Sequence, residues 1–233
     1  MSDTWFLMED KARSPYMNMA IDELLLAEAP TYNTPLIRFY TWDRPSVSIG
    51  YVQKYSAAPE KGYTIVRRPT GGGVVFHDSD LTYTAVIPVN HPIYRLDRME
   101  SYHVFHRAVL RALDALGLPG CLAPDESGPV DRATMQCFTT PTRYDVLSQG
   151  KKYAGAAQRR GKTGILHQGS VSLKAASGNY QLLKEKLIKA FEEELNINFK
   201  NFVPDCRLYK MAEKLAMSKY SVGAWNIHKT WRA

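Results

Sequence analysis

Strand-like segments occur along this chain in groups, and amphipathic helices separate the groups instead of following every strand. The expected strands cover residues 36–42, 46–50, 63–67, 81–87, 144–147, 152–157 and 164–173, and the expected helices cover 15–26, 100–116 and 180–195. A parallel sheet would need a crossover helix between its paired strands. The pattern therefore predicts an α+β fold with a mixed, largely antiparallel sheet and packed helices, and not a doubly wound parallel sheet.

The sequence shows no boundary between two domains. It contains no repeat, no low-complexity segment and no linker that clearly divides the chain. A chain of 233 residues can build one large domain with a sizeable core. We therefore expect a single domain over residues 1–233.

Composition argues against several classes of protein. There is no run of about 18 apolar residues, so we expect no transmembrane helix. The N-terminus has no basic region followed by an apolar stretch, so we expect no secretory signal. Three cysteines are too few, and odd in number, for a disulfide framework, which fits a reducing compartment. A cytoplasmic protein without membrane contact is the resulting expectation.

The net charge of +7 suggests an acidic partner. The basic residues are scattered, apart from short clusters at 67–68, 151–152 and 159–162. No zinc-finger pattern and no RNA-recognition motif accompanies them. These features favour an acidic protein over a nucleic acid as the partner.

A glycine triplet at 71–73 is the first unusual feature. It follows Arg67, Arg68 and Thr70, and His77 comes shortly after it. Three glycines free the backbone to turn sharply and to approach a ligand closely. Consecutive backbone N–H groups there could hold a carbonyl oxygen or a phosphate. Taken alone, the pattern also fits a plain glycine hairpin with two solvated arginines.

Small residues at 154–157 are the second unusual feature. They pack little and are therefore uncommon in a strand. An eight-carbon acyl chain lying against them would explain their size. Lys152, considered alone, would be a surface lysine at a hairpin turn, but neighbours on a strand face opposite sides, so Lys151 and Lys152 should point apart. In the next strand, His167 has polar and small neighbours and could be either functional or structural.

These segments together resemble the lipoate-protein ligase and octanoyltransferase family. Residues 67–78 match an RR-x-S/T-GGG-x-x-x-HD pattern, 150–158 match G-x-K-x-x-G-S/A-A-Q, and 166–170 match L-H/Q-H/Q-G-S/T. The helix at 15–26 and a tail at 216–226 extend the resemblance over most of the chain. It implies the α+β catalytic domain of lipoate and biotin ligases, and as substrate-binding residues it implies Arg67, Arg68, Thr70, Gly71, Gly72, Gly73, His77, Gly155, Ala156, Gln158, His167 and Gly169.

One octanoyltransferase branch of this family uses a cysteine in a C-F-x-x-P-x-x-Y-D/E segment just before the lysine. Residues 137–145 read CFTTPTRYD, and Lys152 follows them. The resemblance implies Cys137 as the nucleophile and Lys152 as a general base or an electrostatic anchor. A cysteine attacks as the thiolate, which a nearby positive charge favours. The other two cysteines lack this context.

This branch implies a reaction and its partners. An octanoyl or lipoyl group would pass from acyl carrier protein, through a cysteine thioester, to a lysine of a lipoyl domain. The acceptors would be E2 subunits of 2-oxoacid dehydrogenases or the glycine cleavage H protein. No cofactor and no metal would be needed. A lipoyl amidotransferase, acting between two lipoyl proteins, would use the same Cys137 and Lys152.

Two features lean toward the ATP-dependent ligases of the family. Residues 71–74 read GGGV, whereas the cysteine-type enzymes often have GGR-G at this place. Residues 167–170 read HQGS, whereas the cysteine-type enzymes tend to have QHGS. Under this alternative, ATP and Mg²⁺ would be the cofactors, and Lys152 would contact an acyl-adenylate. A non-catalytic binder of acyl chains or lipoyl domains is a further alternative. Biotin ligation is disfavoured because the GRGRRGR loop is absent.

Overall fold

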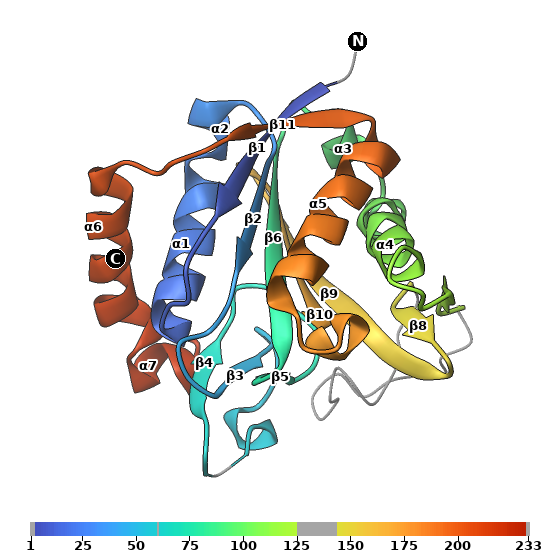
Figure 1. Cartoon of the computed structure of the whole chain (residues 1–233). Helices are drawn as coiled ribbons and strands as arrows, with labels where there is room; N and C mark the ends of the chain where they lie inside the picture. The colour runs from blue at the N-terminus through green and yellow to red at the C-terminus, as the bar shows by residue number, and fades with distance from the viewer. Residues whose placement is uncertain (1–2, 60, 125–143, 232–233) are drawn as a thin grey trace.

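The computed structural model describes residues 3–59, 61–124 and 144–231, and Figure 1 shows its arrangement. Within these residues, an eight-stranded sheet has the order β11 (Ile197–Asn201), β1 (Asp3–Glu9), β2 (Leu36–Tyr40), β6 (Asp80–Pro88), β10 (Gly164–Ser172), β9 (Lys151–Gly161), β8 (Val146–Ser148) and β7 (Gly120–Leu122). A smaller sheet has the order β4 (Thr64–Arg67), β3 (Ser46–Ile49) and β5 (Val75–His77).

Strand pairing in the large sheet is mixed. Strand β1 runs parallel to both β2 and β11, whereas β2–β6, β6–β10, β10–β9, β9–β8 and β8–β7 are antiparallel. The smaller sheet is mixed as well, because β3 is parallel to β4 and antiparallel to β5. The prediction of a mixed, largely antiparallel sheet in an α+β fold is confirmed.

Helices cover both faces of the large sheet (Figure 1). Helices α4 (Arg98–Asp114) and α5 (Tyr180–Leu195) pack on one face, over a core that includes Phe105 and Phe191. Helices α1 (Pro15–Ala27) and α6 (Cys206–Leu215) cover the other face. The remaining short helices are α2 (Ala29–Tyr32), η1 (Tyr55–Ala57), α3 (Pro92–Arg95), η2 (Leu173–Ala176), the π-helical η3 (Ala216–Tyr220) and α7 (Gly223–Asn226).

Local capping explains where the two best-defined helices begin. Ser14 caps α1 by accepting a hydrogen bond from the backbone N–H of Met17 at 3.2 Å, and Pro15 occupies the first turn. Helix α4 starts two residues earlier than expected. Asp97 and Glu100 form a capping box there, with Asp97 accepting from the backbone N–H of Glu100 at 2.8 Å.

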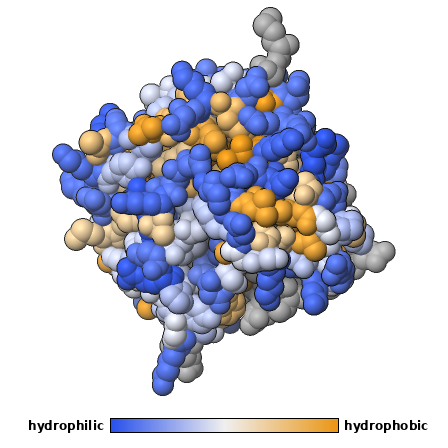
Figure 2. All heavy atoms as spheres, in the orientation of Figure 1, coloured by the Kyte–Doolittle hydropathy of each residue, from blue (hydrophilic) through white to orange (hydrophobic). Residues whose placement is uncertain are grey.

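The outer surface alternates in polarity. On the face shown in Figure 2, hydrophobic residues form small patches separated by hydrophilic ones. Within the described ranges, no helix is both long and apolar enough to cross a lipid bilayer.

A buried ion pair joins α1 to the large sheet. The Arg38 guanidinium on β2 is fully buried and donates to Oδ1 of Asp22 on α1 at 2.7 Å, and to Oδ2 of Asp10 at 2.8 Å. The second oxygen of Asp22 accepts from the Tyr40 hydroxyl at 2.9 Å and the Thr84 hydroxyl at 2.8 Å. A buried charge is costly unless it is paired and hydrogen-bonded, and here both conditions hold.

Arg38→Met should lower the free energy of unfolding by about 3–5 kcal/mol, because it leaves the buried carboxylate of Asp22 without its cation, whereas Asp10 still pairs with Arg13 at 2.8 Å. Urea denaturation measures the change. Arg111→Met is the matched control, since Arg111 pairs with Glu193 on the surface, where exposed pairs contribute at most about 1 kcal/mol. Equal losses in the two variants would contradict the structural role of Arg38.

Candidate active site

A narrow, mainly apolar cavity lies where the small sheet meets the large one. Its walls come from α1, from the strands and from Arg68 in the segment that joins β4 to β5, whereas Gly71, Gly72 and Gly73 of that segment do not line it. The lining residues are Met19, Tyr40, Trp42, Ser48, Arg68, Val75, His77, Thr82, Gly155, Ala156, Ala157, Gln168, Gly169 and Ser170. Each of the three motif segments noted in the sequence therefore contributes to one cavity.

Three small residues form the β9 part of the wall. Gly155, Ala156 and Ala157 all line the cavity, which is the arrangement expected if they make room for an apolar group. From β10 come Gln168 and Ser170, which the sequence analysis did not select. Both lie beside predicted residues in a strand with period-two alternation, and that alternation was the signal that could have identified them.

His77 is held at the cavity by contacts on both ring nitrogens. Its Nδ1 lies 2.8 Å from Oδ2 of Asp80, and its Nε2 lies 2.8 Å from the Ser48 hydroxyl oxygen. The imidazole also stacks on the Trp42 ring, with 3.8 Å between the ring centroids. Asp80 further accepts from the Ser170 hydroxyl at 2.6 Å. This network fixes the orientation of a predicted site residue and leaves little freedom for the ring to rotate.

Arg68 shapes the glycine turn. Its Nη2 donates to the carbonyl oxygens of Gly71 at 2.6 Å and Gly73 at 2.7 Å. Gly72 between them has φ +82°, a conformation that favours glycine. A Cβ on Gly72 would also lie only 2.9 Å from Nη2 of Arg68. Arg68 thus binds the carbonyl groups of the turn. That the N–H groups of residues 71–73 hold a carbonyl oxygen or a phosphate of a ligand remains a prediction.

Arg67 does not line the cavity, although it precedes Arg68. Its side chain is fully buried, and Nη1 donates to the carbonyl oxygens of residues 50, 51 and 53 at 2.9, 3.0 and 2.7 Å. Nη2 donates to the carbonyl oxygen of Asn226 at 2.7 Å. Burial lowers the pKa of Arg67 from its ordinary value. The structure therefore gives this predicted substrate-binding residue a clamping role between two backbone segments.

Thr70 connects the glycine turn to Gln168 of β10. Its hydroxyl donates to Oε1 of Gln168 at 2.7 Å, and Nε2 of Gln168 donates to Asp22 at 2.7 Å. The turn is therefore connected through two hydrogen bonds to the buried carboxylate on α1. Thr70 itself is fully buried and is not a lining residue.

His167 and Gln158 lie on the opposite face of the sheet, beneath α4. Nδ1 of His167 is 2.9 Å from Nε2 of Gln158, and its Nε2 is 3.2 Å from the Tyr83 hydroxyl. The imidazole packs on Phe105 with 4.4 Å between centroids. Burial, and then the neighbouring His106, hold the pKa of His167 well below its usual range. Neither predicted residue is among those that line the cavity.

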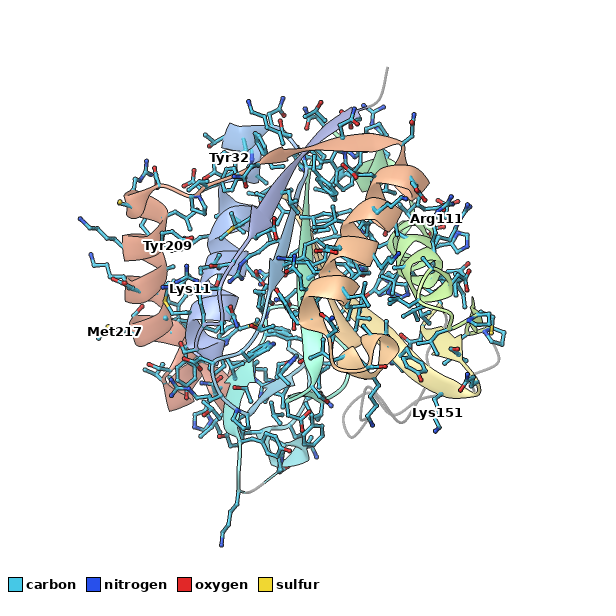
Figure 3. All side chains as sticks on the ribbon, viewed as in Figure 1. Lys11, Tyr32, Arg111, Lys151, Tyr209 and Met217 are labelled. Carbon is cyan, nitrogen blue, oxygen red and sulfur yellow. The ribbon has the colours of Figure 1, made fainter. Side chains whose placement is uncertain are left out.

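Lys152 of β9 is not itself a lining residue, but it lies next to Gly155, which is. Its side chain is 1% exposed, and Nζ lies 2.6 Å from Oδ2 of Asp145, whose side chain is 2% exposed. A Cβ on Gly155 would lie 2.8 Å from that Nζ, so the missing side chain of this lining residue provides the space for the ammonium. Lys151 is exposed and extends outward (Figure 3). The predicted opposite orientation of the two lysines is confirmed.

Cys137 lies outside the described residues. The chain on either side of residues 125–143 is joined, because the N–H of Ala123 donates to the carbonyl of Asp145 at 2.8 Å and the N–H of Tyr144 donates to the carbonyl of Ala123 at 2.9 Å. Both ends of that segment are therefore adjacent to the partner of Lys152. Cys121 and Cys206 are exposed. No cluster of three or more His, Cys, Asp or Glu side chains suited to a metal ion occurs in the part of the chain that the structure describes.

Comparison with known proteins agrees with this architecture. Residues 14–203 match the model of the lipoyl protein ligase A/B catalytic domain, and the chain belongs to that family. It is 36% identical over 184 residues to octanoyltransferase LipM of Staphylococcus aureus, a match that covers 73% of this chain and 66% of the relative. It is 30% identical over 276 residues to octanoyltransferase LipM of Geobacillus kaustophilus, covering 97% of this chain and 99% of the relative.

Solved structures show the same fold. A lipoate-protein ligase A bound with ATP superposes with a TM-score of 0.75 at 24% identity, covering 97% of this chain and 99% of the other. A bi-partite lipoate protein ligase of Thermoplasma acidophilum superposes with a TM-score of 0.73 at 22% identity, covering 99% of this chain and 99% of the other. The expected fold type is confirmed.

Gly169→Ala should lower the free energy of unfolding by about 1–3 kcal/mol, because a Cβ there would lie 2.2 Å from Cε1 of Tyr83 in a packed core. Thermal and urea denaturation measure the loss. Gly161→Ala, at the end of β9, is the control; its Cβ would meet nothing within 4 Å, and the change should stay within about 1 kcal/mol. A Gly169→Ala protein of unchanged stability would exclude this packing role.

Proposed function

We propose that the protein transfers an octanoyl or lipoyl group from acyl carrier protein to a lysine of a lipoyl domain. The acceptors are E2 subunits of 2-oxoacid dehydrogenases or the glycine cleavage H protein. Cys137 carries the acyl group as a thioester between the two steps. The similarity to octanoyltransferases LipM over most of the chain supports the reaction class.

The observation that carries this proposal is the placement of Lys152 beside a cavity walled by small residues. The backbone of Gly155, Ala156 and Ala157 leaves room for an unbranched, apolar chain. Lys152 is not among the lining residues, but its Nζ lies 2.8 Å from the position that a Cβ on the lining residue Gly155 would take. An acyl chain in the cavity with its carbonyl toward Lys152 would meet a fixed positive charge in a dry site, where electrostatic stabilisation is strongest.

The chemistry needs no external energy source. In the first step the Cys137 thiolate attacks the donor thioester, and the thiol of the carrier protein leaves. One thioester replaces another, so the free energy change of this step is close to zero. In the second step the acceptor amine attacks, an amide forms and Cys137 is released as the thiol. Amide formation drives the sequence, and we propose that neither ATP nor Mg²⁺ takes part.

Charge is consistent with the proposed partners. The chain carries a net charge of +7, and an acidic carrier protein or lipoyl domain would be attracted to it. Such attraction raises the rate of encounter more than the final affinity, and salt weakens it.

Cys137→Ala should abolish transfer, because without the thiolate there is no nucleophile to accept the acyl group. Intact mass after incubation with octanoyl-carrier protein should show an octanoyl adduct on the parent that survives denaturation and is lost to hydroxylamine. The adduct should be absent from Cys137→Ala. Cys121→Ala and Cys206→Ala, which remove exposed thiols, should retain the adduct and the activity. Normal turnover by Cys137→Ala would refute the thioester route.

A second function, ATP-dependent ligation, is favoured by Val74 and by the order of residues in 167–170. The two reactions differ in the donor they use. We expect full transfer from octanoyl-carrier protein without nucleotide, and no transfer from free octanoate or lipoate when ATP and Mg²⁺ are added. The reverse result would establish ligation. A third arm, with an octanoylated lipoyl domain as donor, detects amidotransfer between lipoyl proteins.

A further inference from the structure

We propose that Asp145 is a positioning residue that holds Lys152 as an ammonium at the cavity wall, so that Lys152 acts through its charge and does not accept a proton during transfer. This inference rests on the proposed function. It assigns Asp145 a role that the sequence motif alone did not suggest, and it decides between the two roles considered for Lys152.

The ion pair itself is the first observation. Nζ of Lys152 lies 2.6 Å from Oδ2 of Asp145, and both side chains are almost completely buried. A Cβ on Gly155 would lie 2.9 Å from Oδ1 of Asp145, so the same missing side chain accommodates both partners. A buried carboxylate without its cation is strongly unfavourable. Loss of a proton from Lys152 would remove the positive charge that lies beside this buried carboxylate.

Asp145 is oriented through its backbone from two sides. Ala123, after β7, donates to the carbonyl of Asp145 at 2.8 Å. On α4, Nδ1 of His106 forms a short hydrogen bond with the carbonyl of Tyr144. Tyr144 has φ +69°, which is uncommon for a residue other than glycine and indicates that the surroundings impose this conformation. The backbone at Asp145 is thus held by contacts that do not involve Lys152.

The titratable groups around the pair are few among the described residues. His106 faces it from α4; burial lowers the pKa of His106 although Asp145 opposes the shift, which favours a neutral imidazole that donates through Nδ1. His103, also on α4, packs on the Tyr144 ring with 5.0 Å between centroids. A neutral His106 adds no charge to the pair. The ion pair places the negative charge of Asp145 directly beside Lys152.

This arrangement defines the path of the proton. The acceptor amine forms a bond to the acyl carbon, and the carbon–sulfur bond breaks, with its electron pair leaving on sulfur. The proton lost from the amine ends on the departing thiolate or in solvent. Lys152 stabilises the developing negative charge on the carbonyl oxygen and is an ammonium before and after the step.

Asp145→Asn tests the proposal, because it preserves the shape of the side chain and removes its charge. We expect transfer at neutral pH to fall at least about tenfold, as loss of one charge-stabilising group does in other enzymes. The alkaline limb of the plot of rate against pH should move to lower pH, because removal of a neighbouring negative charge lets a buried ammonium lose its proton more readily. A faster Asp145→Asn enzyme at neutral pH would overturn the proposal, since that result requires neutral Lys152 as a base.

Asp145→Glu provides the rescue variant and serves if Asp145→Asn does not fold. It keeps the charge, so the alkaline limb should remain at the parental position even if the longer side chain slows transfer. A limb displaced in this variant, with the fold intact by circular dichroism, would overturn the proposal. Glu193→Gln removes an exposed carboxylate paired with Arg111 and should leave both rate and pH profile unchanged.

The experiment separates this inference from the function on which it rests. If the parent protein transfers nothing from octanoyl-carrier protein, the proposed function fails. If the parent is active and Asp145→Asn matches it in rate and pH profile, only the role of Asp145 is refuted.

Discussion

The fully buried carboxylate of Asp22 connects more of this fold than any other single group described above. It binds Arg38 of β2 directly, and it accepts hydrogen bonds from Tyr40, from Thr84 of β6 and from Gln168 of β10. Through Gln168 and Thr70 it also supports the glycine turn. This one buried carboxylate therefore fixes the positions of helix α1, three strands of the sheet and the glycine turn relative to one another. Breaking its contacts would leave a buried charge unpaired, which is strongly unfavourable.

The two adjacent arginines stabilise different parts of the structure around the cavity. Arg68 draws the carbonyl groups of the glycine turn together at the wall, while Arg67 points away and joins residues 50–53 to Asn226. Trp225 closes the same junction by donating to the carbonyl of Arg67 at 2.8 Å. The C-terminal helix α7 is thus part of the support of the turn, although it lies far from the turn in sequence.

The sequence predicted the fold class, and it predicted the bounds of α1 and β10 to within a residue. These elements depend on short-range features of the chain, namely helix capping and continuous apolar runs. It did not predict β1 or β11. Strand β1 buries Trp5 and Met8 at a spacing of three, and β11 buries mainly Ile197, so neither alternates as an isolated strand would. Their parallel pairing joins distant parts of the chain. In the site, the small residues of β9 and the inward direction of Lys152 were predictable from strand geometry. The burial of Arg67 was not, because it depends on Asn226, and the orientation of His167 depends on helix α4.

The junction of Ala123 with Tyr144 and Asp145 has an evolutionary consequence. Since the chain on either side of residues 125–143 is hydrogen-bonded to itself beside Lys152, the intervening sequence can change in length and content while the surrounding framework keeps its geometry. A change in the length of residues 125–143 would then leave the pairing of β7, β8 and β9 and the contact between Lys152 and Asp145 in place.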